Sequence, residues 1–340
     1  MMSATRQVRL RAYAKLNLDL KVLNRGADGF HELRSVFQTV SLFDTLDLAF
    51  TPGKQTEIEL DGPAGIPDNL VTRAARLLVE QAGGQASGRI VMKLKKQIPM
   101  GAGMGGGSSD AAAVLLGLPV LAGWRIPLET LLRIGASLGS DVPFFLLGGA
   151  AVALGRGTEI YPLPDFPGKR VLIAAPPIHV STPEAYRAFA RDSNGKLTED
   201  QRIQYIDSFQ SRVWRLGDPS SSGGVGAQAE NDFEGVVFPR HPQLKSILKN
   251  LQKSGADPAR MTGSGSALFG VFTTQNQVRQ AQAACETLRP QPATFSAAFL
   301  SRKQYRAAWW RQLQEHMDGN KDGKQWPPQS RHASRRRREQ

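Results

Sequence analysis

A glycine-rich segment, PMGAGMGGGSS at residues 99–109, constrains the fold of this chain more than any other part of the sequence. Before it, Ile90, Met92 and Leu94 recur at every second position, which predicts a strand, and after it DAAAVLLGL contains strong helix formers. Glycine lets backbone N–H groups approach an anion closely, and a helix N-terminus adds unpaired donors and partial positive charge. The order strand, glycine loop, helix therefore predicts a phosphate site, in preference to a flexible turn that only needs positive φ angles.

Three known kinds of phosphate loop fit this segment poorly. Gly101, Gly103 and Gly106 satisfy the dinucleotide pattern GxGxxG, but the acidic residue at a suitable spacing, Glu129, lies in the helical pattern LETLLRIGASLG. The P-loop requires a lysine before its Ser/Thr, and Gly107 occupies that position. The protein-kinase motifs V-A-I-K, H-R-D and D-F-G do not occur in the sequence.

The first fifty residues are rich in predicted strand. Every second residue from Leu16 to Val22 is apolar, which is the period of a half-buried strand. Lys15, Asn17 and Asp19 therefore share the polar face of this strand.

The length of the chain favours two domains. A chain of 340 residues with 41% hydrophobic content exceeds what one compact core usually organises, so we expect two domains that share a cleft. Pro and Gly are dense in residues 155–170, which indicates the boundary. Strands and helices alternate beyond it, which predicts a small α/β sandwich.

Cysteine usage and hydropathy limit the cellular environments that suit this protein. The single cysteine, Cys285, excludes a disulfide framework, and no Cys/His cluster has the spacing of a zinc site. The longest apolar run, at residues 142–154, is far shorter than the roughly 20 residues of a membrane helix. The first residues lack an apolar signal core, so we expect a soluble, cytoplasmic protein with no membrane partner.

The formal net charge of +13 is unevenly distributed. Residues 302–340 hold 11 Lys/Arg and 4 Asp/Glu, so more than half of the excess positive charge lies in this tail. A basic protein of this kind can bind nucleic acid, but here that interpretation applies to the tail and not to the rest of the chain.

Three motifs together resemble those of a known superfamily. PMGAGMGGGSSDAA resembles the central motif of the GHMP kinases, whose glycine loop holds ATP, and AKLNLDL at 14–20 and MTGSGSALFGVF at 261–272 resemble two further motifs in the expected order. Within that superfamily, DGFHELRSVFQTV, GSDVPFFLLGGAA and NDFE are similar to the family of 4-diphosphocytidyl-2-C-methyl-D-erythritol kinases. The resemblance extends from about residue 8 to residue 301.

The resemblance implies an α+β, two-domain GHMP kinase fold. It places an ATP-binding domain like domain 2 of ribosomal protein S5 at 1–165, a ferredoxin-like α/β sandwich at 166–301, and a basic, flexible tail at 302–340. The implied reaction is ATP-dependent phosphorylation of the 2-hydroxyl of 4-diphosphocytidyl-2-C-methyl-D-erythritol, which gives the 2-phosphate and ADP in the non-mevalonate route to isoprenoid precursors. Mg²⁺ is expected to accompany ATP, although no sequence motif for a metal site is present.

The same resemblance assigns the catalytic residues. Asp141 in GSDVPFF accepts the proton of the hydroxyl, and Lys15 in AKLNL holds Asp141 ionised and stabilises charge in the transition state. Taken alone, Asp141 would indicate a helix cap or turn acid, and Lys15 a solvated strand charge. Ser108 or Ser109 is expected to contact the phosphates or Mg²⁺, or only to cap the helix. The expected ATP-binding residues are Pro99, Met100, Gly101, Ala102, Gly103, Met104, Gly105, Gly106, Gly107, Ser108 and Ser109, with Asn69 and Lys96 near the adenine.

The substrate is expected to be a cytidine diphosphate sugar alcohol. By resemblance, His31 hydrogen-bonds the cytosine edge, while Phe30 and Tyr186 stack on its two faces. The family often has Tyr where Phe30 stands, and stacking survives this change. The other expected substrate contacts are Asn17, Thr182, Gly263 and Ser264.

Two regions depart from the family pattern. Residues 191–230 are longer than the family requires and rich in Ser and Gly near their end, which indicates a disordered, peripheral loop. The tail contains Trp309, Trp310, Trp326 and RHASRRRR, which favours a solvated appendage, although RAAWWRQLQEHM can also form one helix that docks its tryptophans on the body.

Two other functions remain open from the sequence. The chain can be another GHMP small-molecule kinase, which loss of the preference for cytidine would favour. It can also be a nucleic-acid-binding protein that uses the tail, in which case RNA affinity falls steeply with salt and vanishes when 302–340 is deleted, whereas kinase activity survives the deletion.

Overall fold

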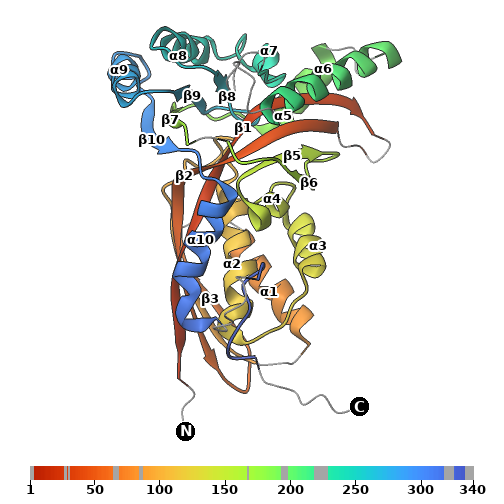
Figure 1. Ribbon diagram of the computed structural model, residues 1–340, viewed down its shortest axis with the longest axis vertical. Coiled ribbons are helices and arrows are strands. Elements are labelled where there is room, and N and C mark those ends of the chain that lie inside the picture. The colour runs from red at the N-terminus through yellow and green to blue at the C-terminus, as the bar shows by residue number, and fades with distance from the viewer. Residues whose placement is uncertain are drawn as a thin grey trace.

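The computed structural model describes most of the chain: residues 4–26, 29, 31–63, 69–83, 87–166, 168–192, 198–217, 229–317 and 325–333. In these residues, two sheets and the helices packed on them form an α+β architecture, as predicted (Figure 1).

The first sheet is built on a long antiparallel hairpin of two strands. These strands, β1 and β2, pair along most of their length, with Lys15 opposite Thr39 and Asn17 opposite Phe37. The strands lie in the order β3-β4-β2-β5-β6, with β1 paired to β2 outside this order, and β3 runs parallel to β4. Among the described residues the sheet consists of β1 (Arg6–Arg25), β2 (His31–Pro52), β3 (Glu57–Asp61), β4 (Gly88–Lys95), β5 (Ala150–Leu154) and β6 (Glu159–Pro162).

Four helices pack on this sheet, and the second of them is apolar on all sides. Fourteen of its 17 residues are buried, since it lies between the β1–β2 hairpin and the neighbouring helices. A helix that is hydrophobic all round is typical of such a central position. The four helices are α1 (Leu70–Ala82), α2 (Gly106–Ala122), α3 (Leu128–Leu138) and α4 (Val142–Leu147).

The second sheet is antiparallel, in the order β10-β7-β9-β8, with helices covering it. Its strands are β7 (Arg170–Ala175), β8 (Ala259–Met261), β9 (Leu268–Phe272) and β10 (Ala293–Ala298). The helices of this half are α5 (Thr182–Asp192), α6 (Glu199–Gly217), α7 (Phe233–Val237), α8 (Pro242–Lys253) and α9 (Gln275–Glu286).

The two halves share an apolar core. Leu16 and Leu18 from β1 pack in one buried cluster with Val171 of β7 and Phe269 of β9. The β1–β2 hairpin runs from the first half into the second (Figure 1). The alternation of β1 therefore sends its apolar residues into this core and leaves Lys15, Asn17 and Asp19 for the other face.

The expectation of a flexible tail is wrong for the part of it that the structure describes. Residues 302–313 form α10 (Arg302–Leu313), followed by a short 3₁₀ turn, η1 (Gln314–His316). Tyr305, Trp309 and Leu313 recur every four residues, so they share one face of α10 and join the core of the first half. Deletion of 302–340 is accordingly expected to expose this core, not to leave activity intact. The basic run at 334–340 lies outside the described residues.

The expectation of a disordered loop at 191–230 is wrong in part. Residues 199–217 form the helix α6, and its Arg212 is 8% exposed. Residues 193–197 and 218–228 of the predicted loop lie outside the described residues. No helix in the described part of the chain combines the length and apolarity needed to cross a membrane.

Candidate active site

The glycine loop leads into the N-terminus of α2 as predicted. Gly101, Gly103 and Gly105 all have positive φ angles, between 66° and 79°. Gly105 is the N-cap residue, and no described side chain caps this helix end. The first N–H groups of α2 are thus available to an external anion. The loop lines a cavity of about 380 Å³, together with Asn69, Leu70, Leu94, Lys96, Ile98 and Asp110.

A buried charge cluster lies at the edge of this cavity. Lys96 forms ion pairs with Asp44 and, at 2.6 Å, with Asp110. Burial opposes the charge on Lys96, but the two carboxylates outweigh it and raise its pKa. Burial raises the pKa of Asp110 to about 7 against the effect of Lys96. Asn69 also borders the cavity, where its side chain caps α1 by accepting a hydrogen bond from the Val71 N–H.

The two serines at the start of α2 have different surroundings. Ser108 lines both the loop cavity and a second, larger one. Ser109 is 2% exposed, and its hydroxyl donates to the carbonyl of Tyr13 in β1 at 2.7 Å. Ser108 therefore lies where the two cavities meet, whereas Ser109 holds α2 against the strand.

Lys15 and Asp141, predicted from distant parts of the sequence, lie together. The Lys15 ammonium is 3.4 Å from a carboxylate oxygen of Asp141. It also donates to the Asn17 side-chain oxygen at 2.6 Å and lies 4.8 Å from the centre of the Phe37 ring. Asp141 occupies the N-cap position of α4, yet within the described part of the chain its carboxylate caps no backbone N–H. The helix-cap interpretation thus has no support from the geometry.

The first and third motifs are joined through Asn17. Its side-chain oxygen accepts hydrogen bonds from Lys15 and, at 2.9 Å, from the backbone N–H of Gly263. Gly103 approaches Thr262 so closely that a Cβ at Gly103 would lie 2.1 Å from the Thr262 carbonyl oxygen. Glycine is required here because backbone meets backbone, and this contact brings the glycine loop against the third motif.

A second cavity of about 740 Å³ adjoins the Lys15–Asp141 pair. The rings of His31 and Tyr186 stack in it, with centroids 5.4 Å apart and an interplanar angle of 26°. Burial, and then the charge of Asp141, raise the pKa of Tyr186 to about 12. Thr182 and Ser264 hydrogen-bond each other at 2.8 Å at its wall. Phe30, the other predicted stacking residue, lies outside the described residues.

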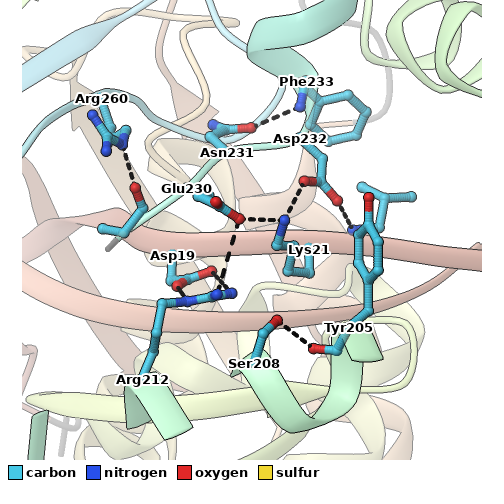
Figure 2. A network of polar contacts seen from close by, with 12 residues as sticks. Asp19, Lys21, Tyr205, Ser208, Arg212, Glu230, Asn231, Asp232, Phe233 and Arg260 are labelled. Carbon is cyan, nitrogen blue, oxygen red and sulfur yellow. Dashed lines mark hydrogen bonds and ion pairs between the residues drawn. The ribbon is translucent and has the colours of Figure 1, made fainter. Parts of the chain in front are cut away.

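Figure 2 shows a second cluster of charged residues, next to β1, to which the sequence analysis assigned no role. Arg212 binds Asp19 through two nitrogens, and Lys21 pairs with Asp232 at 3.0 Å and with Glu230. The signals were present: Asp19 shares a face with Lys15, and Asp232 belongs to the NDFE segment. We refer to Asp19, Lys21, Arg212, Glu230 and Asp232 as the clamp cluster.

NDFE also supports the third motif. The Asn231 amide donates to the carbonyls of Met261, at 2.7 Å, and Gly263, at 2.9 Å. Glu234 accepts from the backbone N–H of Met261 at 2.7 Å. The segment therefore fixes the loop that contacts Asn17 and Gly103.

Comparisons with known proteins agree with this geometry. Residues 69–149 match the model of the GHMP kinases N terminal domain, and residues 222–289 match that of the GHMP kinases C terminal. A 4-diphosphocytidyl-2-C-methyl-D-erythritol kinase of Solibacter usitatus is 52% identical over 97% of this chain and 99% of its own length. The chain belongs to this kinase family.

Solved structures confirm the predicted fold. The crystal structure of a 4-(cytidine 5'-diphospho)-2C-methyl-D-erythritol kinase matches with a TM-score of 0.69 and 35% identity, over 86% of this chain and 98% of that one. Homoserine kinase from Cytophaga hutchinsonii matches with a TM-score of 0.66 at 18% identity over 87% of this chain and 95% of that one, which bears on the fold alone. An ATP-dependent kinase with a GHMP kinase fold, as predicted from the motifs, is thereby confirmed.

Proposed function

We propose that this protein transfers the γ-phosphoryl group of ATP to the 2-hydroxyl of 4-diphosphocytidyl-2-C-methyl-D-erythritol. The observation that carries the proposal is the Lys15–Asp141 pair, 3.4 Å apart, at the wall of a cavity that also contains Gly103, Gly105 and Ser108 of the phosphate loop. Membership of the kinase family supplies the identity of the acceptor.

Asp141 is proposed to accept the proton of the attacking hydroxyl. Its carboxylate is 28% exposed, so substrate can reach it, whereas Lys15 is almost wholly buried. Phosphoryl transfer depends on orienting the nucleophile and stabilising charge on the transferring oxygens. Lys15 provides positive charge beside Asp141, and Asn17 holds the Lys15 ammonium in place through a 2.6 Å hydrogen bond.

The phosphates of ATP are proposed to bind the glycine loop and the N-terminus of α2. Open backbone N–H groups and the helix dipole both favour an anion there. Ser108 is the hydroxyl ligand that fits Mg²⁺ best, because it lines the loop cavity and the acceptor cavity alike. Mg²⁺ commonly binds through one or two protein oxygens plus substrate phosphates and neutralises charge as it develops. Lys96, held by two carboxylates, and Asn69 are proposed to border the adenine.

The cytidine end of the acceptor is proposed to bind at His31 and Tyr186. Their stacked rings present an aromatic wall in the larger cavity, and base stacking is worth about 1 to 3 kcal/mol per contact in nucleic-acid binders. Arg25 and Arg156 line the same cavity, which gives it positive charge suited to a diphosphate. The Asn17 side chain accepts hydrogen bonds from the Lys15 ammonium and the Gly263 N–H, so its proposed role is to position Lys15 and the loop at Gly263.

The proposal is tested by measuring ADP formation with purified full-length protein, ATP and Mg²⁺. The acceptors are 4-diphosphocytidyl-2-C-methyl-D-erythritol, the corresponding cytidine-free 4-phosphate, homoserine and mevalonate, and ³¹P NMR locates the new phosphomonoester. We expect turnover with the first acceptor only, at its 2-hydroxyl. Turnover of homoserine, mevalonate or the cytidine-free alcohol at equal or higher kcat/KM contradicts the proposal, as does the absence of any turnover.

A further inference from the structure

The C-terminal segment, defined as residues 302–317 and 325–333, reaches the helix that bears Asp141. The Tyr305 hydroxyl donates to the carbonyl of Phe145 at 2.5 Å, and the Trp326 indole N–H donates to that of Leu146 at 2.8 Å. Both carbonyls lie in the last turn of α4, where a helix has no N–H of its own to offer them. The segment thus caps α4 from outside.

The contact is tightly packed on both sides. Tyr305 is 1% exposed, and a Cβ at Gly148 would lie 2.2 Å from its ring. A Cβ at Gly149 would lie 2.7 Å from the Cβ of Arg302. Two consecutive glycines with φ angles of 70° and 74° therefore end α4 in the conformation and with the space that α10 requires.

The other end of α4 carries the proposed proton acceptor. α4 has six residues, so Asp141 lies only about 9 Å from the capped end. Tyr305 also packs on Tyr13, with ring centroids 5.8 Å apart, and Tyr13 precedes Lys15 by two residues in β1. One buried side chain therefore contacts both elements that hold the Lys15–Asp141 pair.

The share of this chain that aligns with a relative shows whether the relative can contain an equivalent of the C-terminal segment. The alignment with the Solibacter usitatus kinase covers 97% of this chain, so it cannot omit a stretch as long as 302–333. The solved 4-(cytidine 5'-diphospho)-2C-methyl-D-erythritol kinase is covered over 98% of its length but matches only 86% of this chain. Additional chain is therefore a feature of some members of the family.

We propose that Tyr305 and Trp326 are positioning residues for phosphoryl transfer: they fix the short helix α4 so that the Asp141 carboxylate stays beside Lys15. The inference rests on the proposed function, in which Asp141 accepts the proton. Misplacement of a reacting group by about 1 Å can lower a rate about 100-fold, so a six-residue helix that loses its outside caps is expected to lower turnover.

The test uses the full chain with Tyr305→Phe, Trp326→Phe and the double variant, each of which keeps an aromatic ring. Ser330→Ala is the matched control, because the Ser330 hydroxyl donates from the same segment to the Val120 carbonyl near the end of α2, at 2.5 Å. We expect the double variant to lose about tenfold in kcat, with the KM for ATP changed by less than about twofold. Ser330→Ala is expected to keep the wild-type kcat. Thermal melting of each variant checks that it is folded at the assay temperature.

A second arm separates positioning from general loosening of the structure. The double variant is combined with Asp141→Asn, and no further loss of kcat is expected, since groups that act through one residue are non-additive. The same fold-loss in both backgrounds, or no loss in the wild-type background, overturns the inference while the proposed function stands. Failure of the wild-type protein to turn over the substrate overturns both.

Discussion

Strand β1 contributes side chains to two polar clusters that are built in opposite ways. The site cluster, Lys15, Asn17 and Asp141, borders the acceptor cavity and keeps its carboxylate 28% exposed. The clamp cluster begins four residues along the strand from Lys15, and its Asp19 is 2% exposed and bound by Arg212 through two nitrogens (Figure 2).

The difference lies in what the carboxylate is free to do. An accessible carboxylate beside a cation can take up a proton from a substrate, and its protonation costs the fold little. A carboxylate enclosed by a guanidinium cannot react, but removal of its partner leaves a buried charge. The site cluster should therefore govern the reaction and the clamp cluster the stability of the fold.

The largest effect is expected from Asp141→Asn. Loss of a positioned proton acceptor should lower kcat by about 10² to 10⁴-fold, with the melting temperature nearly unchanged because the side chain is partly exposed. Steady-state ADP formation measures this. Asp47→Asn is the matched control, since Asp47 pairs with Arg9 on the surface. A fall in kcat of less than about threefold contradicts the assignment.

Arg212→Met should have the opposite profile. Breaking a buried ion pair by removing one partner costs about 3 to 5 kcal/mol of unfolding free energy, whereas kcat per folded molecule should be retained. Urea unfolding measures the free energy of unfolding, and activity titration measures kcat per folded molecule. Arg9→Met removes an exposed guanidinium and should leave the free energy of unfolding nearly unchanged, because exposed ion pairs contribute little. Equal costs for the two variants would remove the distinction between the clusters.

The clamp cluster should also make stability depend on pH. Burial raises the pKa of Asp19 from 3.8 to about 6, despite the opposing effect of Arg212. The unfolded chain then loses this proton at lower pH than the native state does, so the contribution of Asp19 to stability falls as the pH rises from about 4 to 6. The unfolding free energy of the wild type, minus that of Asp19→Asn, should decrease by about 2 to 3 kcal/mol. An increase over this range shows that Arg212 outweighs burial.

Ser35→Ala should have the smallest effect. The Ser35 hydroxyl accepts from the Asn17 amide at 2.9 Å and donates to the Asp19 carbonyl at 2.6 Å, so it connects the two clusters. Its loss should cost about 1 to 3 kcal/mol of unfolding free energy and change kcat by less than about threefold. A loss of kcat comparable to that of Asp141→Asn would show that the clusters do not act independently.

Local pattern was sufficient for the parts of the site that lie on one element. The alternation of β1 placed Lys15, Asn17 and Asp19 on one face, and the glycine pattern predicted the loop and the start of α2. The pairing of Lys15 with Asp141 came from the family resemblance, because no local pattern relates residues that are 126 positions apart.

The missed features depend on packing between distant segments. Arg212 lies in a stretch whose composition indicated disorder. Its role, which is to pair with the buried Asp19 carboxylate, becomes visible only when the two segments are packed together. In the tail, the alternative of one helix that docks its tryptophans on the body is confirmed by α10, whose Trp309 joins the core of the first half, whereas the favoured solvated appendage is wrong for this helix. The net charge of residues 302–340 favoured the appendage because a sum over the whole stretch takes no account of one apolar face within it.

The most direct test of the account is single-turnover phosphoryl transfer, with enzyme in excess, for Lys15→Met, Asp141→Asn and the double variant. If the two residues act as one unit, the double variant should lose no more than about the larger of the two single losses. Losses that multiply, or single variants that transfer the phosphoryl group at the wild-type rate, would show that the Lys15–Asp141 pair is not the centre of the reaction.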